Sequence, residues 1–489
     1  MTALGDGTPA MKILFLSNVF PPQVLGGYEL GCLSIAEACR RAGHDVTVLT
    51  SYPAGTLATC DVAHRLRVLR LFAPAHDLIG EGWAHRHSEA RVGLGGIVPG
   101  NCLALDNVIR AEKPDALWCF NPLGIGPVGI FEVAALSGVP TVVHLMDHLD
   151  AMVGISQNGF HATGRWAEAK RRLAAIGCSQ ATLESNSTIG TYRTTAVIPN
   201  GIPVDELGHE RRRFRRIEAG AAVRLVYFGQ IIPEKGVSGL VPAVRRLRRL
   251  LARPVELHLV GRCPRDYESA LRAWIRRDGI EDAVIWHGLL DRAGVDRVLA
   301  EMHVAVLPLR SDEPFGYVGL EAIAQRLPLV AAARAGFTAL VPPGYPFLID
   351  DPASVDEIVA AVASVCRDQE ACERWVDAAC GRVLECGDLE RAVLPRYIAF
   401  LEQVRAEAAT APAARGDIGS LIASWQMSRN LSRLVPEAAA APTVAEPRPA
   451  AWRPYGRKLR SMLRDAVPES WRLQLRKITS RARGGPRRP

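Results

Sequence analysis

The sequence lacks the marks of several protein classes. None of its eleven cysteines forms a Cys-x-x-Cys pair, and no histidines stand at zinc-ligand spacing, so no structural zinc site is predicted. No run of 18 or more apolar residues occurs, which argues against a transmembrane helix. The first ten residues are polar and Gly-rich, without the charged and apolar regions of a signal peptide. We therefore expect a cytoplasmic protein with reduced cysteines.

Most of the chain also has no excess of basic over acidic residues. Residues 451–489 contain twelve Lys and Arg against two acidic residues, a local charge of +10 in a chain whose net charge is +8. The rest is thus close to neutral, and no nucleic-acid partner is predicted.

The chain does have the composition of an α/β protein and its alternation of strands and helices. A length of 489 residues predicts two or three globular units. Apolar residues make up 48% and charged residues 22% of the chain, which is typical of globular proteins. An apolar strand at 12–17 is followed by a loop, a helical pattern that stops at Gly43 and a strand at 45–50, and similar units recur up to 196–199. A second series comprises strands at 224–228, 256–260, 304–308 and 329–332. This alternation predicts two doubly wound parallel sheets.

These patterns divide the chain into segments. We expect a disordered N-terminus at 1–10, a first Rossmann-like domain at 11–205 and a second at 206–388. A long amphipathic helix at 389–408 follows the second sheet. An Ala- and Pro-rich linker at 409–450 has too few large apolar residues to close a core.

Ligands of open parallel sheets bind beyond the carboxyl ends of the strands, so the loops there are the candidate sites. Gly26 and Gly27 precede the first helix, where backbone N–H groups can approach a diphosphate or a sugar, although a simple turn explains them equally well. Lys235 occupies the corresponding loop of the second unit and can neutralise phosphate, although a lysine there is more often only solvated. Glu313 and Glu321 stand at a later loop-to-helix junction, where carboxylates can accept from sugar and ribose hydroxyls; two exposed glutamates are the plain alternative.

Taken in order, these motifs resemble a known family. Gly26-Gly27-x-Glu29, Ile-Pro-Asn-Gly-Ile at 198–202, Lys235-Gly236 and Glu-Pro-Phe-Gly through Glu-Ala at 313–322 together resemble the family 4 retaining glycosyltransferases of the GT-B fold, over roughly residues 11–405. The resemblance implies two Rossmann-like domains facing across a cleft, with the helix at 389–408 returning to the first. It also implies transfer of a sugar, with retention of configuration, from a nucleotide diphosphate sugar to a glycan, lipid-linked or small-molecule acceptor.

The resemblance also implies roles for individual residues. Glu321 would bind the donor ribose, Lys235 the diphosphate, and Glu313 with the backbone of Phe315 and Gly316 the transferred sugar. The catalytic candidates are Glu313, Lys235 and His144. The donor-binding candidates are Gly26, Gly27, Gln230, Lys235, Arg262, Phe315, Gly316 and Glu321. Since no Asp-x-Asp triplet occurs, we expect no metal and no other cofactor, and the leaving diphosphate must be stabilised by protein groups.

The chain departs from the family pattern at three places. Gln230 stands where the family often has Arg, so Arg262 becomes a candidate for the second phosphate cation. The family's Gly-Gly-x-x-Glu segment appears at 335–340 without the glutamate. The His-Asp pair expected after 141–145 becomes His144-Leu-Met-Asp147-His148. Asp147 and His148 are thus acceptor-side candidates, and either histidine could contact sugar or be structural.

One motif competes with this interpretation. The glycines of 124–129 follow a strand and open a helix like a dinucleotide fingerprint, with Asp147 downstream. However, the segment lies in a late crossover, and Pro127 removes a backbone N–H that would hold pyrophosphate. We therefore favour a sugar nucleotide over NAD.

The basic tail and the overall activity each leave alternatives. In 451–489 apolar residues recur at helical spacing among arginines, which suits an anionic membrane surface and a peripheral location. A disordered solubilising tail and a protein-docking helix are the other interpretations. For the chain as a whole, the alternatives are a non-catalytic nucleotide-binding or interaction module on the same scaffold and an epimerase or phosphorylase-like enzyme.

Overall fold

The computed structural model describes residues 9–21, 24, 27–51, 65–69, 96–156, 160–205, 212–310, 314–410, 419, 421 and 423. Gly26, Glu313, the tail at 451–489, nearly all of the linker at 409–450 and the first eight residues lie outside this part of the chain. The predictions made for them stay predictions.

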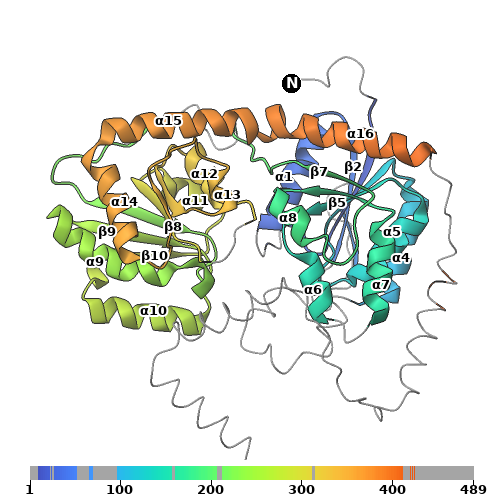
Figure 1. Cartoon of the computed structure of the whole chain (residues 1–489), viewed down its shortest axis with the longest axis horizontal. Coiled ribbons are helices and arrows are strands. Elements are labelled where there is room, and N and C mark those ends of the chain that lie inside the picture. Colours follow the sequence, from blue (N-terminus) through green and yellow to red (C-terminus); the bar gives the residue numbers. More distant parts are fainter. Residues whose placement is uncertain are drawn as a thin grey trace, which may run out of the picture. The chain divides into compact units, whose positions relative to one another are not determined.

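The first lobe is built on a seven-stranded sheet in which all neighbouring strands are parallel (Figure 1). Its strand order is β3-β2-β1-β4-β5-β6-β7. The bounds are β1 Lys12–Ser17, β2 Asp45–Ser51, β3 Arg65–Leu69, β4 Ala116–Asn121, β5 Thr141–Leu145, β6 Ala174–Gly177 and β7 Thr194–Val197. The order changes direction between β1 and β4, and such a switch point is where open α/β sheets bind ligands.

Helices connect these parallel strands. They are α1 Gly27–Arg41, α4 Pro99–Glu112, α5 Pro127–Ser137, α6 Leu149–Ser156, α7 Phe160–Lys170 and α8 Gln180–Ser185. Helix α1 has Glu29 in its first turn and two arginines in its last, which complements the helix dipole. Helix α5 is apolar nearly all round and buried from Pro127 to Ala134, as expected for a crossover packed on several sides.

The second lobe is built on a six-stranded parallel sheet with the order β10-β9-β8-β11-β12-β13. Its strands are β8 Val223–Phe228, β9 Val255–Val260, β10 Val284–Gly288, β11 Val304–Leu307, β12 Leu329–Ala332 and β13 Leu348–Ile349. Its helices are α9 Leu240–Leu251, α10 Arg265–Asp278, α11 Arg292–Leu299, α12 Tyr317–Ala324, α13 Ala335–Thr338, α14 Val355–Arg367 and α15 Gln369–Cys386, with 3-10 turns at Pro233–Lys235, Val237–Gly239 and Glu281–Ala283.

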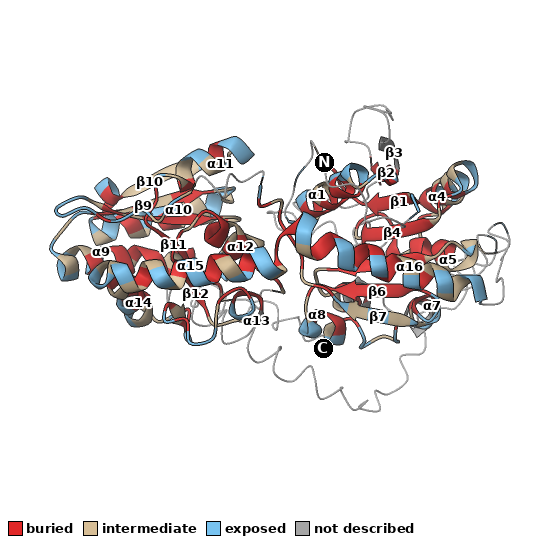
Figure 2. Ribbon diagram, turned by 90° about the horizontal axis from the view of Figure 1, so that it is seen from above, coloured by how far each residue is buried: buried red, intermediate tan, exposed pale blue. Residues whose placement is uncertain are grey.

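The core of each lobe lies between the sheet and its covering helices. Strands β4 and β11 are buried along their whole length, and Figure 2 shows exposed residues gathered on the outer faces of the helices. Helix α9 illustrates the pattern, because Val241, Val244 and Leu247 are buried while Arg245 and Arg249 are exposed. Such a stripe at helical spacing holds a surface helix on a sheet.

The segment that follows β7 pairs with the segment that follows α15. Ile202 donates its N–H to the Gly387 carbonyl at 3.0 Å, and the Leu389 N–H donates to the Ile202 carbonyl at 2.9 Å. A Cβ on Gly201 would lie 2.7 Å from Leu389 Cα, so this close approach requires glycine. After a π-helical turn at Leu389–Val393, α16 (Leu394–Thr410) contacts α1 and β5 of the first lobe.

The predicted fold class is confirmed, and several predicted elements match closely. The strands predicted at 12–17 and 329–332 have those bounds in the structure. The strand predicted at 196–199 begins earlier, at Thr194. Strands β3, β6, β10 and β13 were not predicted.

Candidate active site

Neighbouring strands of the second sheet end in loops that touch one another. Gly229 follows β8 with φ 124° and Gly261 follows β9 with φ 141°. A Cβ on Gly261 would lie 1.8 Å from the Gly229 carbonyl oxygen, so only glycine permits this approach. The Ile231 N–H donates to the Arg262 carbonyl at 2.9 Å and joins the two loops.

Lys235 lies in the loop after β8, on the turn that also contacts the loop after β11. Its side chain is partly exposed. Gly236 follows with φ 74°, and a Cβ there would lie 1.9 Å from the Pro308 carbonyl oxygen at the end of β11. The Arg310 N–H donates to the Glu234 carbonyl at 2.9 Å. The lysine turn is thus held against the segment that leads from β11 to α12.

Three of the predicted donor-binding residues therefore share one edge of the sheet. Gln230 is fixed through its carbonyl, which accepts the Tyr227 hydroxyl at 2.7 Å. Arg262, on the adjacent loop, is exposed, and Lys235 is five residues beyond Gln230. The chemistry available here is that of two cations beside backbone N–H groups, which suits an anionic ligand.

The start of α12 contributes the next two predicted residues. Phe315 is 6% exposed and packs edge-on against Tyr317, with ring centroids 5.2 Å apart. Gly316 adopts φ 86° at the N-cap position, where a left-handed residue turns the chain into the helix. This geometry leaves the N-terminal amides of α12 at the carboxyl edge of the sheet.

Glu321 lies in the second turn of α12 and is bound to a residue that the sequence analysis did not single out. Its Oε1 atom is 2.7 Å from Nη1 of Arg292, in the first turn of α11. Burial raises the pKa of Glu321, and the Arg292 charge and hydrogen bond act against this shift. The carboxylate therefore sits in a partly desolvated place with a cation beside it.

In the first lobe, Asn18 ties together the ends of three strands. Its side-chain amide donates to the Leu123 carbonyl at 2.7 Å, and its own N–H donates to the Asn121 carbonyl at 2.7 Å. Its carbonyl accepts the Ser51 N–H at 3.3 Å. The carboxyl ends of β1, β2 and β4 are thereby joined ahead of α1, whose first residue, Gly27, is exposed.

Gly27 and Gly31 of α1 lie against the Tyr317 ring. A Cβ on Gly27 would be 3.1 Å from Tyr317 Cδ2, and a Cβ on Gly31 would be 2.6 Å from the Tyr317 hydroxyl. The residue next to Gly316 thus contacts the same helix that begins at Gly27. Gly27, one of the two glycines predicted for diphosphate binding, thus also makes room for this tyrosine.

His144 lies in the core of the first lobe. Its ring is fully buried, stacks on Phe120 at 4.6 Å and meets the edge of Tyr397 at 5.4 Å. The Nε2 atom is 2.8 Å from Asn200 Oδ1, and burial lowers the pKa of His144 to about 4. The ring is therefore neutral near pH 7, and its side chain has no exposed surface for a sugar.

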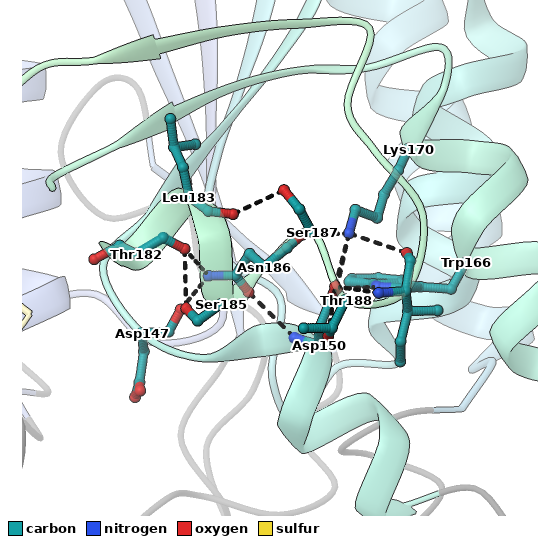
Figure 3. A network of polar contacts seen from close by, with 11 residues as sticks. Asp147, Asp150, Trp166, Lys170, Thr182, Leu183, Ser185, Asn186, Ser187 and Thr188 are labelled. Atoms are coloured by element: carbon teal, nitrogen blue, oxygen red, sulfur yellow. Dashed lines mark hydrogen bonds and ion pairs between the residues drawn. The ribbon is translucent and has the colours of Figure 1, made fainter. Parts of the chain in front are cut away.

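Asp147 and His148 are partly exposed in the loop that follows β5. Asp147 Oδ1 accepts the His148 N–H at 2.8 Å. The Asp147 carbonyl accepts the side-chain amide of Asn186 at 2.7 Å, which connects this loop to α8 (Figure 3). The structure thus separates the two histidines that the sequence left as alternatives, since His144 points into the core and His148 lies in the loop.

A buried ion pair lies just beyond this loop and joins α6 to α7. Lys170 Nζ lies 2.9 Å from both carboxylate oxygens of Asp150, and both side chains are fully buried (Figure 3). Asp150 also accepts from Trp166 Nε1 at 2.7 Å and from the Ile189 N–H at 2.8 Å. Lys170 further donates to the carbonyls of Asn186 at 2.5 Å and Ile189 at 3.1 Å. Helices α6 and α7 and the segment after α8 are therefore joined at one point.

Roles for Arg292, Asn18 and the Asp150–Lys170 pair were not predicted from the sequence. Asn18 and Asp150 each follow a predicted strand within a few residues. Because candidate sites lie in the loops after strands, this position could have identified them. Arg292 follows β10, a partly buried strand that was not predicted.

The competing glycine motif has a packing role. Gly124 and Gly126 both have positive φ, and a Cβ on Gly126 would lie 2.8 Å from the Val98 backbone. A Cβ on Gly129 would lie 2.6 Å from the Cys102 sulfur of α4. These glycines allow α5 to approach α4 closely.

The described residues contain neither a metal-binding cluster nor a membrane-spanning helix. No group of three or more His, Cys, Asp and Glu in this part of the chain could hold a metal ion. No helix among the described residues is both long and apolar enough to cross a membrane.

Comparison with known families and relatives agrees with the geometry. The model of glycosyl transferases group 1 matches residues 210–382, and the model of the glycosyl transferase 4-like domain matches residues 26–201. A glycogen synthase of Mycobacterium tuberculosis is 28% identical over 421 residues, covering 81% of this chain and 96% of the relative. A GDP-mannose-dependent phosphatidylinositol monomannoside mannosyltransferase of the same species is 28% identical over 214 residues, covering 39% of this chain and 54% of the relative.

Solved structures share the fold. The sucrose-phosphate synthase of Thermosynechococcus elongatus superposes with a TM-score of 0.61 at 17% identity, over 81% of this chain and 99% of that one. The Anabaena protein HepE, determined with UDP and glucose, gives 0.54 at 21% identity, over 82% and 99%. With two matched family models, two doubly wound sheets and these neighbours, the chain belongs to the family 4 glycosyltransferases of the GT-B fold.

Proposed function

We propose that this glycosyltransferase moves a hexosyl group from a nucleoside diphosphate sugar to a glycan, lipid-linked or small-molecule acceptor, with retention of configuration and without a metal ion. The observation that carries the proposal is the joining of the loops after β8, β9 and β11 around Lys235 at one edge of the second sheet. The HepE structure with UDP and glucose and the named activities of the relatives support a nucleotide-sugar donor.

In this proposal, the second lobe stabilises the leaving diphosphate. The Lys235 ammonium and the N–H groups at the starts of the following helices would carry the negative charge that grows as the glycosidic bond breaks. Arg262 would add a second cation, because this chain has Gln230 where the family often has an arginine. Because these groups are held by the backbone contacts described above, they need little reorganisation during the reaction.

We further propose that Asp147 and His148 contact the acceptor through their side chains. Both are partly exposed, whereas the His144 ring is fully buried. His144 would then act through its hydrogen bond to Asn200, which connects the end of β5 with the 198–202 segment. Glu313 keeps its proposed role beside the transferred sugar, as a residue outside the described part of the chain.

A thermal-shift screen of the full chain against UDP, GDP, ADP and their sugars tests donor binding. A ligand at 100 times its Kd stabilises the native state by about 2.7 kcal/mol, so one nucleotide series should raise the melting temperature measurably. Transfer is then measured as nucleotide release with and without added acceptor, in buffer containing EDTA. Release that depends on acceptor and persists in EDTA is expected.

Three results would argue against this function. Binding of no nucleotide would remove the donor site. Nucleotide binding with no release under any acceptor would favour a non-catalytic module. Loss of release in EDTA, restored by a divalent ion, would contradict metal independence.

A further inference from the structure

The carboxylate of Glu321 is held by a residue of a neighbouring helix. Asp291 caps α11 by accepting the Gly294 N–H at 2.7 Å, which fixes the first turn where Arg292 lies. From there, Arg292 reaches Glu321 Oε1 at 2.7 Å and Asp296 Oδ1 at 3.2 Å. Arg292 thus contacts a carboxylate of its own helix and one of α12.

The pair is unevenly buried and uses only one of the two carboxylate oxygens. The Glu321 side chain is 17% exposed and the Arg292 side chain 43%. Within the described part of the chain, Oε1 accepts from Arg292 and no hydrogen bond to Oε2 is found. A carboxylate can accept about four hydrogen bonds, so Glu321 retains most of its capacity.

We infer that Arg292 is a positioning residue for the sugar-nucleotide donor: it holds Glu321 by Oε1 so that Oε2 remains to accept from the ribose hydroxyls. This inference rests on the proposed function, because it assumes that a nucleoside diphosphate sugar binds at this edge. It adds a residue from α11, a helix to which the sequence patterns assigned no role.

The chemistry requires an ionised carboxylate with a fixed direction. Both ribose hydroxyls are donors, and a protonated carboxyl group offers fewer acceptor sites to them. A free glutamate side chain would also lose rotamer freedom when the nucleotide binds, and an oxygen already held by an arginine fork loses less. Arg292 therefore supplies both charge and direction.

The pair also predicts a dependence on pH. Among the described residues, Arg292 and Asp296 of α11 and Tyr317 of α12 are the titratable groups in electrostatic contact with Glu321. Burial raises the pKa of Glu321 and Arg292 lowers it, so removing the guanidinium raises that pKa further. In a variant that lacks this guanidinium, nucleotide affinity should fall as the pH is lowered, and it should fall more steeply than in the wild type.

The test is titration of UDP, GDP and ADP into the full-length wild type and the Arg292→Met variant. For the nucleotide that the wild type binds, the variant should show a Kd raised roughly tenfold, as loss of a charge-assisted contact predicts. The ratio should be larger at about pH 6 than at about pH 8, since Glu321 is more fully ionised at the higher pH. Arg292→Lys, which keeps the charge but not the planar fork, should restore part of the affinity.

Two controls separate positioning from a general loss of structure. Arg297→Met removes the same charge from an exposed site on the same helix and should leave the Kd unchanged. In a Glu321→Gln background, Arg292→Met should add little further loss, because its partner is already altered.

The outcomes are distinct. Nucleotide binding by the wild type with an equal Kd in Arg292→Met at both pH values would overturn this inference and leave the proposed function intact. A raised Kd that is the same in Arg297→Met, or independent of pH, would also overturn it. Binding of none of the three nucleotides by the wild type would instead overturn the proposed function.

Discussion

The buried pair of Lys170 and Asp150 offers the sharpest stability test in the first lobe. Replacing Lys170 with Met keeps an unbranched side chain but leaves the Asp150 carboxylate buried without its cation. The carbonyls of Asn186 and Ile189 lose a donor at the same time. Burial lowers the pKa of Lys170, and the contact with Asp150 acts against this shift.

The magnitude follows from what remains around Asp150. Breaking a buried ion pair typically costs about 3 to 5 kcal/mol. Trp166 Nε1 and the Ile189 N–H, at 2.7 and 2.8 Å, still donate to the carboxylate in the variant. We therefore expect a loss of about 3 kcal/mol in the free energy of unfolding of the first lobe, at the lower end of that range.

Urea unfolding followed by tryptophan fluorescence and far-ultraviolet circular dichroism measures the loss. Trp166 is fully buried and bonded to Asp150, so its emission reports on this network. With a urea dependence of about 2 to 3 kcal/mol per molar, the first transition should shift by roughly 1 M. Lys113→Met, an exposed lysine at the end of α4, is the matched control and should shift the midpoint little.

A loss below about 1 kcal/mol, equal to that of Lys113→Met, would refute the reasoning, because it would mean that the carboxylate is adequately solvated without the lysine. A double-mutant cycle with Asp150→Asn gives a second test. The two losses should be strongly non-additive if the side chains interact directly.

Three further predictions concern catalysis, acid stability and the tail. Lys235→Ala should lower kcat by about 10²-fold or more with a folded protein, and an unchanged rate would remove Lys235 from the mechanism. Because the His144 pKa is about 4 in the folded chain and about 6.5 in an unfolded one, the unfolded state binds the extra proton between these values. Stability should therefore fall by about 3 kcal/mol as the pH drops from 6.5 to 4, and His144→Gln should flatten this dependence of the urea midpoint. The full chain should sediment with anionic vesicles and little with neutral ones, and deleting residues 451–489 should abolish the sedimentation with anionic vesicles; equal sedimentation of the full and shortened chains would exclude a membrane role for the basic tail.

The architecture was predictable because local patterns and the global fold agree. Apolar runs such as 12–17 and 329–332 are central parallel strands buried on both faces, and such strands are continuous in hydrophobicity. The strands that were missed are those whose pattern is weak. Strand β6 is made of Ala, Ile and Gly, and in β10 only Val284, Ile285 and Trp286 form an apolar run, so neither has a run of large apolar residues as long as a central strand.

The order of loop motifs was likewise sufficient to indicate the family, which the matched family models confirm. Lys235 could be singled out as a cation in the loop before a helix, and Gly236 and Gly316 as parts of the family's motifs. The structure adds a local reason for the two glycines, a positive φ. The sequence by itself thus determined two doubly wound sheets and which loops of the second sheet are candidates for donor binding.

Only the tertiary structure decided how distant residues pair. His144 is distinguished from His148 by burial against Tyr397, which lies more than 250 positions later on the returning helix. Glu321 meets Arg292, and Asp150 meets Lys170, through the packing of separate helices. Charge pairing across elements depends on distance and desolvation, and neither is recorded in local periodicity, so the electrostatic state of these groups could be known only from the folded chain.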